Sequence, residues 1–392
     1  MSHRIVIVGG GFAGALAARL LGQRHDPDLD ILLIDTKDEF LFAPRLIDAL
    51  ATSSTESKRW SASLEDLGKK FGFRFLRGKV EHVHQEGKTL TVFSDQTGSR
   101  AIPYDTLILS PGAKTCYYGI KGAEEHALAL KNSDDVVRIH QQVESLLRQA
   151  QQVTEPQAKR QLLSFVVVGA GPSGVEGIFA LRTYLETWCK RHDPALFAFA
   201  SFSLIQAGPQ ILPGFPLKMV HTISEELLRY KIRIFIGEAV TEITQNSLTT
   251  NLKHTLPTSL ILWTAGIQPN SIPLEPDVHR DQAGYLIADN FLQVAPNVFA
   301  AGDTILYREN NQVVPRNAQT AILMGRTIAR NILRSIRHHT LQPFTYSSKG
   351  NILVIGKTGC IDIKVTSFQT RFAPLIRDLL YRFRFWQLTG KF

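Results

Sequence analysis

Two short, wholly apolar runs in the chain stand directly before glycine-rich turns. Residues 5–8 (IVIV) and 165–168 (FVVV) are β-branched and aromatic, as is typical of buried parallel strands. Each run is followed by the spacing GxGxxG, at Gly9, Gly11 and Gly14 and at Gly169, Gly171 and Gly174. The first glycine permits a tight turn, the second lets the backbone approach a pyrophosphate, and the third lets the next helix pack on the sheet. The pattern therefore predicts two dinucleotide sites.

The residue that ends the next apolar run differs between the two units. Residues 31–35 (ILLID) end in Asp35, about twenty residues after the first turn, where a carboxylate accepts hydrogen bonds from an adenosine ribose. The corresponding position in residues 202–208 (FSLIQAG) is Gln206. A neutral amide does not repel a 2′-phosphate, so the second site is expected to admit NADPH beside NADH. The alternative is that other groups keep that site selective for NADH.

Further segments complete the expected α/β pattern. Strands are expected at residues 73–80, 103–113, 260–266 and 297–303, a hairpin or small meander near 90–93, and helices at 132–152 and from 315–321 onward. Residues 301–303 read Ala-Gly-Asp, so Asp303 follows a strand at the carboxyl edge of the sheet. A carboxylate there can accept hydrogen bonds from a polyol chain such as the ribityl group of FAD.

Composition narrows the class of protein. A length of 392 residues fits two or three domains, and 44% hydrophobic with 20% charged residues is ordinary for a soluble protein. The longest uncharged run, 196–217, is interrupted by glycine and proline, and the chain enters its first strand at once, so neither a membrane span nor a signal peptide is expected. A cytoplasmic location follows as an expectation.

Charge and cysteine content leave fewer functions open. The net charge of +9 suits nucleic acid, an anionic membrane surface or anionic dinucleotides, and no nucleic-acid motif supports the first. Cys116, Cys189 and Cys360 form no CxxC pair and no metal-ligand spacing, so no metal site is predicted and a reducing compartment is expected.

Several motifs together resemble the two-dinucleotide-binding-domain flavoproteins. They are the paired glycine turns, residues 104–112 (YDTLILSPG), residues 263–266 (WTAG) and residues 301–303 (AGD). The resemblance implies an α/β fold of two Rossmann-like dinucleotide-binding domains, with the NAD(P)H domain inserted into the FAD domain. The expected division is an FAD domain at 1–120 and 271–340, an NAD(P)H domain at 121–270, and a C-terminal strand region with an amphipathic, membrane-associating helix at 341–392.

The same resemblance assigns ligand-binding positions. It places FAD against Gly9, Gly11, Phe12, Ala13, Gly14, Asp35, Val80, Gly112, Gly302, Asp303 and Ala318. It places NADH or NADPH, as the substrate, against Gly169, Gly171, Pro172, Ser173, Gly174, Gln206 and Gly266.

Within this superfamily the chain looks like the type II NAD(P)H:quinone oxidoreductases. Disulfide reductases of this fold need a redox cysteine beside the flavin, whereas residues 1–115 contain no cysteine. Residues 40–44 (FLFAP) are similar to the cyanobacterial and plastid branch, and residues 344–350 (FTYSSKG) and 354–356 (VIG) to the family's C-terminal strand signature. The resemblance implies hydride transfer from NAD(P)H to FAD and then two electrons to a membrane quinone, without proton pumping.

Two side chains gain catalytic roles from this resemblance. Glu176 matches the acidic residue near nicotinamide and flavin, and Gln319 of the Ala318-Gln319 pair matches a quinone-side residue. The alternatives are a first-turn helix carboxylate favoured by the helix dipole and an ordinary polar residue at a helix start. The chain departs from the family at Leu323, where many members have glutamine, and at Arg45-Leu46, which replace an apolar pair.

The last twenty residues predict an amphipathic helix that Pro374 can start. Its apolar stripe comprises Phe372, Leu375, Ile376, Leu379, Leu380 and Phe383. Arg371, Arg377, Arg382, Arg384 and Lys391 are expected to supply positive charge, with Trp386 as an interfacial aromatic and Asp378 as the one acid. We expect peripheral binding at the cytoplasmic face of an anionic membrane. The alternative is packing on the protein's own core or in a homodimer.

The partner expected for the electrons is a membrane quinone such as menaquinone, plastoquinone or a related compound. One rival is a sulfide:quinone oxidoreductase, in which Cys116 and Cys360 would converge near the flavin. Against it, that chemistry has little use for an intact second nucleotide turn. The other rival is a sensor that binds NAD(P)H and turns over only incidentally.

Overall fold

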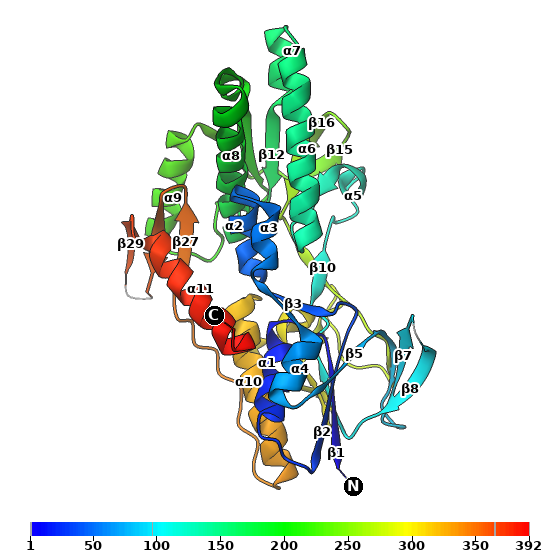
Figure 1. Ribbon diagram of the computed structural model, residues 1–392. Coiled ribbons are helices and arrows are strands. Elements are labelled where there is room, and N and C mark those ends of the chain that lie inside the picture. The colour runs from blue at the N-terminus through cyan, green and yellow to red at the C-terminus, as the bar shows by residue number, and fades with distance from the viewer. Residues whose placement is uncertain (1, 96, 364–365, 392) are drawn as a thin grey trace.

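The computed structural model describes residues 2–95, 97–363 and 366–391 and is built around two parallel sheets (Figure 1). The first sheet has the strand order β22-β23-β9-β1-β2-β5, with only the β22–β23 pair antiparallel. Its strands are β1 His3–Val8, β2 Leu29–Asp35, β5 Arg74–Arg77, β9 Thr106–Leu109, β22 Gln293–Ala295 and β23 Val298–Ala300. Helices α1 (Phe12–Gly22) and α10 (Ala318–Ile336) pack closely against each other beside it.

The second sheet is wholly parallel. Its strands come from the part of the sequence between β9 and β22 of the first sheet. Its order is β11-β18-β12-β13-β14, formed by Ala127–Leu128, Leu260–Trp263, Ser164–Val168, Ser201–Gln206 and Ile232–Ile236. Helices α6 (Ser133–Gln152), α8 (Pro172–His192) and α9 (Leu217–Arg229) belong to this part of the molecule, at the top of Figure 1. The chain leaves the first sheet after β9 and returns to it at β22, which confirms the inserted α/β arrangement.

Two short strands carry the chain between the sheets. Strand β10 (Ala113–Thr115) runs antiparallel to β19 (Ile267–Pro269), so the outgoing and returning segments are hydrogen-bonded to each other. The predicted helix at 132–152 is confirmed as α6, and its start is fixed by a capping box in which Asn132 and Asp135 cap each other's backbone N–H groups.

The smaller elements cover the sheets and the junction. They are β3 Glu39–Leu41, β4 Ser61–Ser63, α2 Leu46–Ala51, α3 Ser54–Lys58, α4 Leu64–Phe71, α5 Ala123–His126, α7 Pro156–Leu162, β15 Val240–Ile243, β16 Ser247–Thr250, β17 Thr255–Pro257, β20 Leu274–Glu275, β21 Leu286–Ile287, β24 Ile305–Leu306, β25 Arg308–Glu309 and β26 Gln312–Val313. The predicted meander is confirmed as β6 (Lys79–His84), β7 (Thr89–Ser94) and β8 (Gly98–Pro103).

One strand expected from the sequence proves to be two. Residues 73–80 divide at Gly78 into β5, in the first sheet, and β6, in the meander. The N–H of Gly78 donates to the carbonyl oxygen of Asp35, and a Cβ at Gly78 would lie 2.9 Å from the Val92 side chain. The chain changes sheets at a position where there is room only for glycine.

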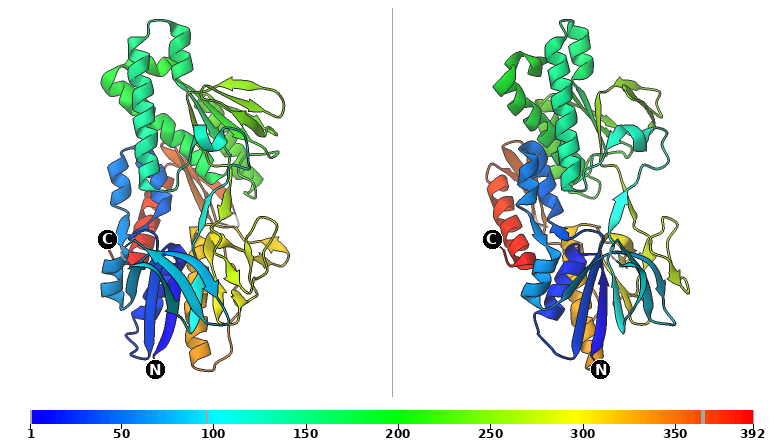
Figure 2. Two further views of the ribbon diagram at one scale, coloured as in Figure 1. Left: turned by 90° about the vertical axis from the view of Figure 1, so that its right-hand side faces the viewer. Right: turned by 45° about the vertical axis from the view of Figure 1, so that its right-hand side comes forward.

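The C-terminal region also differs in part from expectation. Residues 344–350 form no strand, because the backbone of Phe344 bonds to Asn290 and its carbonyl accepts from the Tyr307 hydroxyl. The strands begin later, as β27 (Asn351–Ile355), β28 (Thr358–Asp362) and β29 (Ser367–Thr370). Helix α11 (Ala373–Thr389) follows and lies along the side of the molecule away from the meander (Figures 1 and 2). None of the described helices combines the length and apolarity needed to cross a bilayer.

Candidate functional site: two dinucleotide turns and the junction between them

The first glycine turn is held by three side-chain bonds around a left-handed glycine. Gly9 has φ +98°, and a Cβ at Gly14 would overlap the Gly9 carbonyl oxygen, so helix α1 can start this close to β1 only with glycine there. The Ser110 hydroxyl donates to the carbonyl oxygens of Val8 (3.0 Å) and Gly9 (3.1 Å). Asp35 accepts the N–H of the residue after Gly9 at 2.6 Å.

The second turn is built in the same way. Gly169 has φ +99°, and a Cβ at Gly174 would overlap its carbonyl oxygen. The Thr264 hydroxyl donates to the carbonyls of Val168 and Gly169, both at 2.9 Å. Gln206 Oε1 accepts the N–H of Ala170 at 2.9 Å, as Asp35 does in the first turn. Gln206 therefore occupies the position of the ribose carboxylate, in agreement with the pairing inferred from the sequence.

Ser110 and Thr264 hold the two glycine turns in place and were not among the site residues predicted from the sequence. Each is a hydroxyl residue immediately after an apolar strand, β9 or β18, that pairs with the strand leading into a glycine turn. The shared hydroxyl in the segments LILS and LILWT was the available signal.

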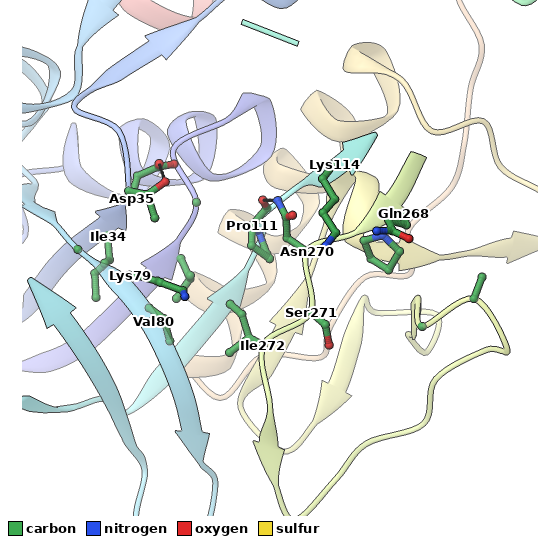
Figure 3. A pocket seen from close by; sticks show the side chains of 17 residues that line it. Ile34, Asp35, Lys79, Val80, Pro111, Lys114, Gln268, Asn270, Ser271 and Ile272 are labelled. Carbon is green, nitrogen blue, oxygen red and sulfur yellow. Dashed lines mark hydrogen bonds between the residues drawn. The ribbon is translucent and has the colours of Figure 1, made fainter. Parts of the chain in front are cut away.

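A cavity of about 600 Å³ opens beside the first glycine turn, where the sequence predicts that FAD binds. Its lining includes three predicted FAD residues, Gly9, Asp35 and Val80. Figure 3 shows Asp35 and Lys79 on one side and Lys114, Asn270 and Gln268 on the other. Lys79, Lys114, Asn270 and Gln268 were not predicted. Lys79 lies in β6, Lys114 in β10, Gln268 in β19 and Asn270 directly after β19. Two lysines suit a ligand that carries a pyrophosphate.

The other predicted FAD residues meet at the starts of α1 and α10. Gly302 has φ +76°, and a Cβ placed on it would lie 3.9 Å from the Ala13 Cβ and 3.7 Å from that of Ala321. A Cβ at Gly325 would overlap the Ala13 carbonyl oxygen, so glycine lets the two helices approach closely. No atom lies within 4 Å of a Cβ built on Gly11, which leaves that side of the turn open to a ligand.

Asp303 is the last residue of the Ala-Gly-Asp motif and directly follows Gly302, which lies near the starts of α1 and α10. Burial raises the pKa of Asp303, and the charges of Lys131 and Arg316 oppose that effect. Ala318 is the first residue of α10, whose start is capped by the Asn317 side chain on the N–H of Thr320. With Phe12 beginning α1 and Gly112 (φ +72°) just beyond β9, the geometry fits an FAD dinucleotide.

Glu176 is buried and ion-paired rather than exposed at the start of α8. Its Oε1 accepts from the N–H of Val354 at 2.8 Å and from Arg377 Nη1 at 2.6 Å. Burial raises the pKa of Glu176, and the charge of Arg377 and the Val354 N–H oppose that rise. Glu176 is not the first-turn carboxylate of the alternative interpretation, since the first turn of α8 contains no acidic residue, and its bonds join α8 to β27 and α11.

Arg377 and Arg45 extend this contact into a buried network of charges. Arg377 Nη2 bonds to Asp48 of α2, whose other oxygen accepts from Arg45 Nη1 at 2.8 Å. Arg45 also bonds to Asp378 and lies 4.0 Å from the centre of the Trp60 ring and 5.1 Å from that of Tyr381. The departure of Arg45 from the family pattern thus has a structural reason, since it fastens residues 43–51 to α11.

The remaining predicted positions lie at the edges of the two sites. Gln319 Nε2 donates weakly to the Ser347 carbonyl at 3.5 Å, and Leu323 packs partly buried against the core. Gly266 is covered by Tyr118, because a Cβ at Gly266 would overlap the phenol, whose hydroxyl donates to the Ala265 carbonyl at 3.2 Å. Pro172 and Ser173 form the first turn of α8.

The apolar stripe of α11 is exposed along its whole length. The exposed fractions are 54% for Phe372, 58% for Leu375, 37% for Ile376, 58% for Leu379, 47% for Leu380 and 49% for Phe383. The alternative that this stripe packs on the protein's own core is therefore wrong. The other face of α11 does pack, through Ala373, Phe385, Leu388 and Thr389. Arg377, expected at the surface, is only 7% exposed, because Glu176 and Asp48 neutralise it inside.

Comparison with known proteins identifies the family. The model of the pyridine nucleotide-disulphide oxidoreductases matches residues 3–325. The chain belongs to this family. Type II NADH:quinone oxidoreductase Ndh of Mycobacterium tuberculosis is 28% identical over 376 residues, covering 92% of this chain and 79% of its own. Demethylphylloquinone reductase NdbB of Synechocystis is 27% identical over 400 residues, covering 98% and 93%.

A solved structure has the same overall fold as this pyridine nucleotide-disulphide oxidoreductase. NDH2 from Plasmodium falciparum in complex with NADH has a TM-score of 0.88 at 19% identity, covering 100% of this chain and 98% of the other. The resemblance to type II NAD(P)H:quinone oxidoreductases that the sequence motifs indicated is confirmed, and a cyanobacterial protein is among the relatives.

The cysteines of this family member do not form a dithiol. All three are free, and burial raises the pKa of Cys189 and of Cys360 to about 11. Cys360 lies in β28 within the core that α8 and α9 share, whereas Cys116 follows β10 and its carbonyl accepts from the Trp263 indole. A buried, protonated thiol is a poor nucleophile, which disfavours sulfide chemistry at Cys360.

Proposed function

We propose that this chain oxidises NADH or NADPH and reduces a membrane quinone, with FAD held at the first glycine turn and NAD(P)H at the second. The observation that carries this proposal is that the two glycine turns have the same construction but are bonded by different side chains. Asp35, at the end of β2, accepts from the first turn, and Gln206, at the end of β13, accepts from the second. A carboxylate accepts hydrogen bonds from the hydroxyls of an adenosine ribose, whereas an amide does not repel the 2′-phosphate of NADPH. The relatives named as NADH:quinone and demethylphylloquinone reductases support the same reaction.

The protein's part in the reaction is to bind and orient. Bound FAD supplies the redox chemistry that links a hydride donor to a quinone. Asp35 would accept hydrogen bonds from the FAD ribose, Asp303 from the ribityl chain, and the first turn of α1 would face the pyrophosphate with its free N–H groups. Lys79 and Lys114 would balance the phosphate charge from the cavity walls. The start of α10 at Ala318 and Gln319 would then lie at the flavin and quinone side.

For Glu176 we propose a positioning role at the nicotinamide side of the flavin. Its place on α8, two residues after Gly174, puts it next to the second glycine turn. Arg377 and the Val354 N–H hold its carboxylate in one orientation. The carboxylate can thereby order neighbouring groups without moving itself.

The reaction is tested by mixing the FAD-loaded protein with NADH under anaerobic conditions in a stopped-flow instrument, and then with soluble analogues of menaquinone, plastoquinone and ubiquinone. We expect rapid bleaching of the flavin and rapid return of its colour with at least one quinone. A long-lived reduced state would instead indicate a sensor. A Cys116→Ser, Cys360→Ser double variant should keep full NADH:quinone turnover, and loss of turnover would favour the sulfide enzyme.

Gln206 is proposed to set the nucleotide preference. Gln206→Asp keeps an acceptor for the Ala170 N–H but adds a negative charge that repels a 2′-phosphate. We expect kcat/KM for NADPH relative to NADH to fall about tenfold or more, equivalent to about 1.4 kcal/mol. Initial-rate kinetics with both nucleotides measure it. A wild-type preference for NADH of a hundredfold or more would contradict the proposal that NADPH is admitted.

We further propose that the protein works at the cytoplasmic face of a membrane as a peripheral protein. The exposed stripe of α11 is suited to lie in the interface, and the exposed Arg371 and Lys391 can contact anionic lipids, as can the Arg382 guanidinium beside its partner Asp378. The remaining alternative for the stripe is a homodimer, in which a second copy would cover it. No nucleic-acid partner is proposed.

A further inference from the structure

A basic groove lies between helices α1 and α10, away from both dinucleotide turns. It encloses a volume of about 400 Å³. Its lining consists of Leu20, Gln23, Arg24, Arg326, Ala329, Arg330 and Leu333. Three of these seven residues are arginines and none is acidic, so the groove is positively charged with apolar margins.

Few carboxylates lie near the groove in the sequence. Residues 310–361, which include all of α10, contain no aspartate or glutamate, and the acidic residues nearest to Arg24 in the sequence are Asp26 and Asp28. Among the residues that the structure describes, Arg24, Arg326 and Arg330 form no ion pair with a carboxylate. Like charges that share a groove repel one another, so binding an anion there would relieve the repulsion.

The groove adjoins the C-terminal end of α11. Arg19 of α1 donates to the carbonyl oxygen of Trp386 at 3.2 Å and to that of Gln387. Burial lowers the pKa of Arg384 of α11, and the charge of Arg326 lowers it further. Helices α1, α10 and α11 lie together in Figure 1, so the basic groove is next to the helix that carries the exposed apolar stripe.

Guanidinium groups suit one kind of ligand in particular. Arginine presents a fixed fork of N–H donors that matches the oxygens of a phosphate, and Leu20 and Leu333 offer contacts to the carbon atoms beside it. A phosphate linked to an apolar chain satisfies both the charge of the groove and the apolar surface of α11.

We propose that the groove between α1 and α10 binds the phosphate headgroup of an anionic phospholipid. The inference rests on the proposed function, since reduction of a membrane quinone brings this side of the protein to a bilayer. A phospholipid is favoured over a free phosphate because α1, which lines the groove, is bonded to the end of α11, the helix whose exposed leucine and phenylalanine side chains a soluble ligand would leave uncovered. The groove would fix how the protein sits on the membrane.

The test is co-sedimentation of the full, FAD-loaded chain with vesicles of phosphatidylcholine alone or with phosphatidylglycerol added. We expect the double variant Arg326→Gln, Arg330→Gln to bind the anionic vesicles roughly thirtyfold more weakly, because it removes two basic side chains that would lie at the anionic surface. Binding to neutral vesicles should change little. The matched control is Arg160→Gln, Arg191→Gln, which removes the same charge from exposed sites near α7 and the end of α8, and should change binding less than twofold.

Three results would overturn the proposal. One is an equal loss of binding in the control, which would mean a response to net charge alone. Another is unchanged binding in the groove variant with a normal melting temperature and FAD content. The third is that calorimetry finds soluble glycerol phosphate bound as tightly as the anionic vesicles, which would make a free phosphate the ligand. Turnover of a soluble quinone is measured in parallel, so that failure of the proposed function shows in the wild type independently of sedimentation.

Discussion

Replacing Arg377 with methionine is expected to destabilise the protein by about 3–5 kcal/mol, because it leaves the enclosed Glu176 carboxylate without a cation and removes one of the two guanidinium groups that pair with Asp48. Both Glu176 and Asp48 bond to this guanidinium, and the side chains of Arg377 and Glu176 are only 8% and 11% exposed. Denaturant unfolding of the FAD-loaded protein measures the loss, and limited proteolysis shows whether α11 detaches first.

A control for this prediction lies on the same helix. Arg382 pairs with Asp378 at the surface, with 59% of its side chain exposed, so Arg382→Met should cost only about 0–1 kcal/mol. Adding Glu176→Gln to Arg377→Met should restore part of the stability, since the second change removes the carboxylate charge that was left without a partner. Equal small effects of Arg377→Met and Arg382→Met would contradict the view that the buried network holds α11 in place.

Replacing three residues of the exposed stripe is expected to abolish most of the membrane binding. Leu375→Ser, Leu379→Ser, Phe383→Ser removes apolar side chains that would enter the interface, each worth about 1–2 kcal/mol when buried there, so vesicle binding should fall at least about a hundredfold. Because these side chains are 49–58% exposed, thermal stability and turnover of a soluble quinone should change little. Co-sedimentation and turnover with a long-chain quinone in vesicles measure the effect.

Exposed leucines elsewhere give the matched control. Leu217 and Leu228 of α9 are 74% and 64% exposed, and Leu217→Ser, Leu228→Ser should leave vesicle binding unchanged. If the wild type elutes as a dimer, the stripe variant elutes as a monomer, and both bind vesicles equally, then the stripe is a subunit interface and the membrane proposal fails.

The parts of the site that could be predicted are those in which chemistry and backbone are neighbours in the sequence. Gly9 and Gly169 follow their strands directly, and their positive φ angles are what the GxGxxG spacing requires. The correspondence of Asp35 with Gln206 was equally readable, because both residues end the next strand of a repeated unit. Local rules of turn and strand therefore predicted two Rossmann-like units with a dinucleotide site in each, and the resemblance to two-dinucleotide-binding-domain flavoproteins supplied their inserted order.

Errors arose where a local pattern was assumed to act alone. Residues 73–80 read as a single strand-like stretch, yet Gly78 passes the chain from one sheet to another, and only the packing of β7 against it decides this. Arg377 has the spacing of a surface cation on an amphipathic helix, but its partners are 201 and 329 residues away in the chain. Helical periodicity cannot reveal which face meets buried carboxylates.

By itself, the sequence determined the two glycine turns, the inserted α/β order, the absence of a redox dithiol in residues 1–115 and the amphipathic nature of residues 372–386. Only the tertiary structure decided that Lys114 and Asn270 line the cavity beside the first glycine turn, that Arg45 and Arg377 fasten α11 from within, and that α1 and α10 form a basic groove beside it. The physical reason is that backbone turns depend on adjacent residues, whereas charge pairs and cavities depend on side chains that packing brings together from distant segments.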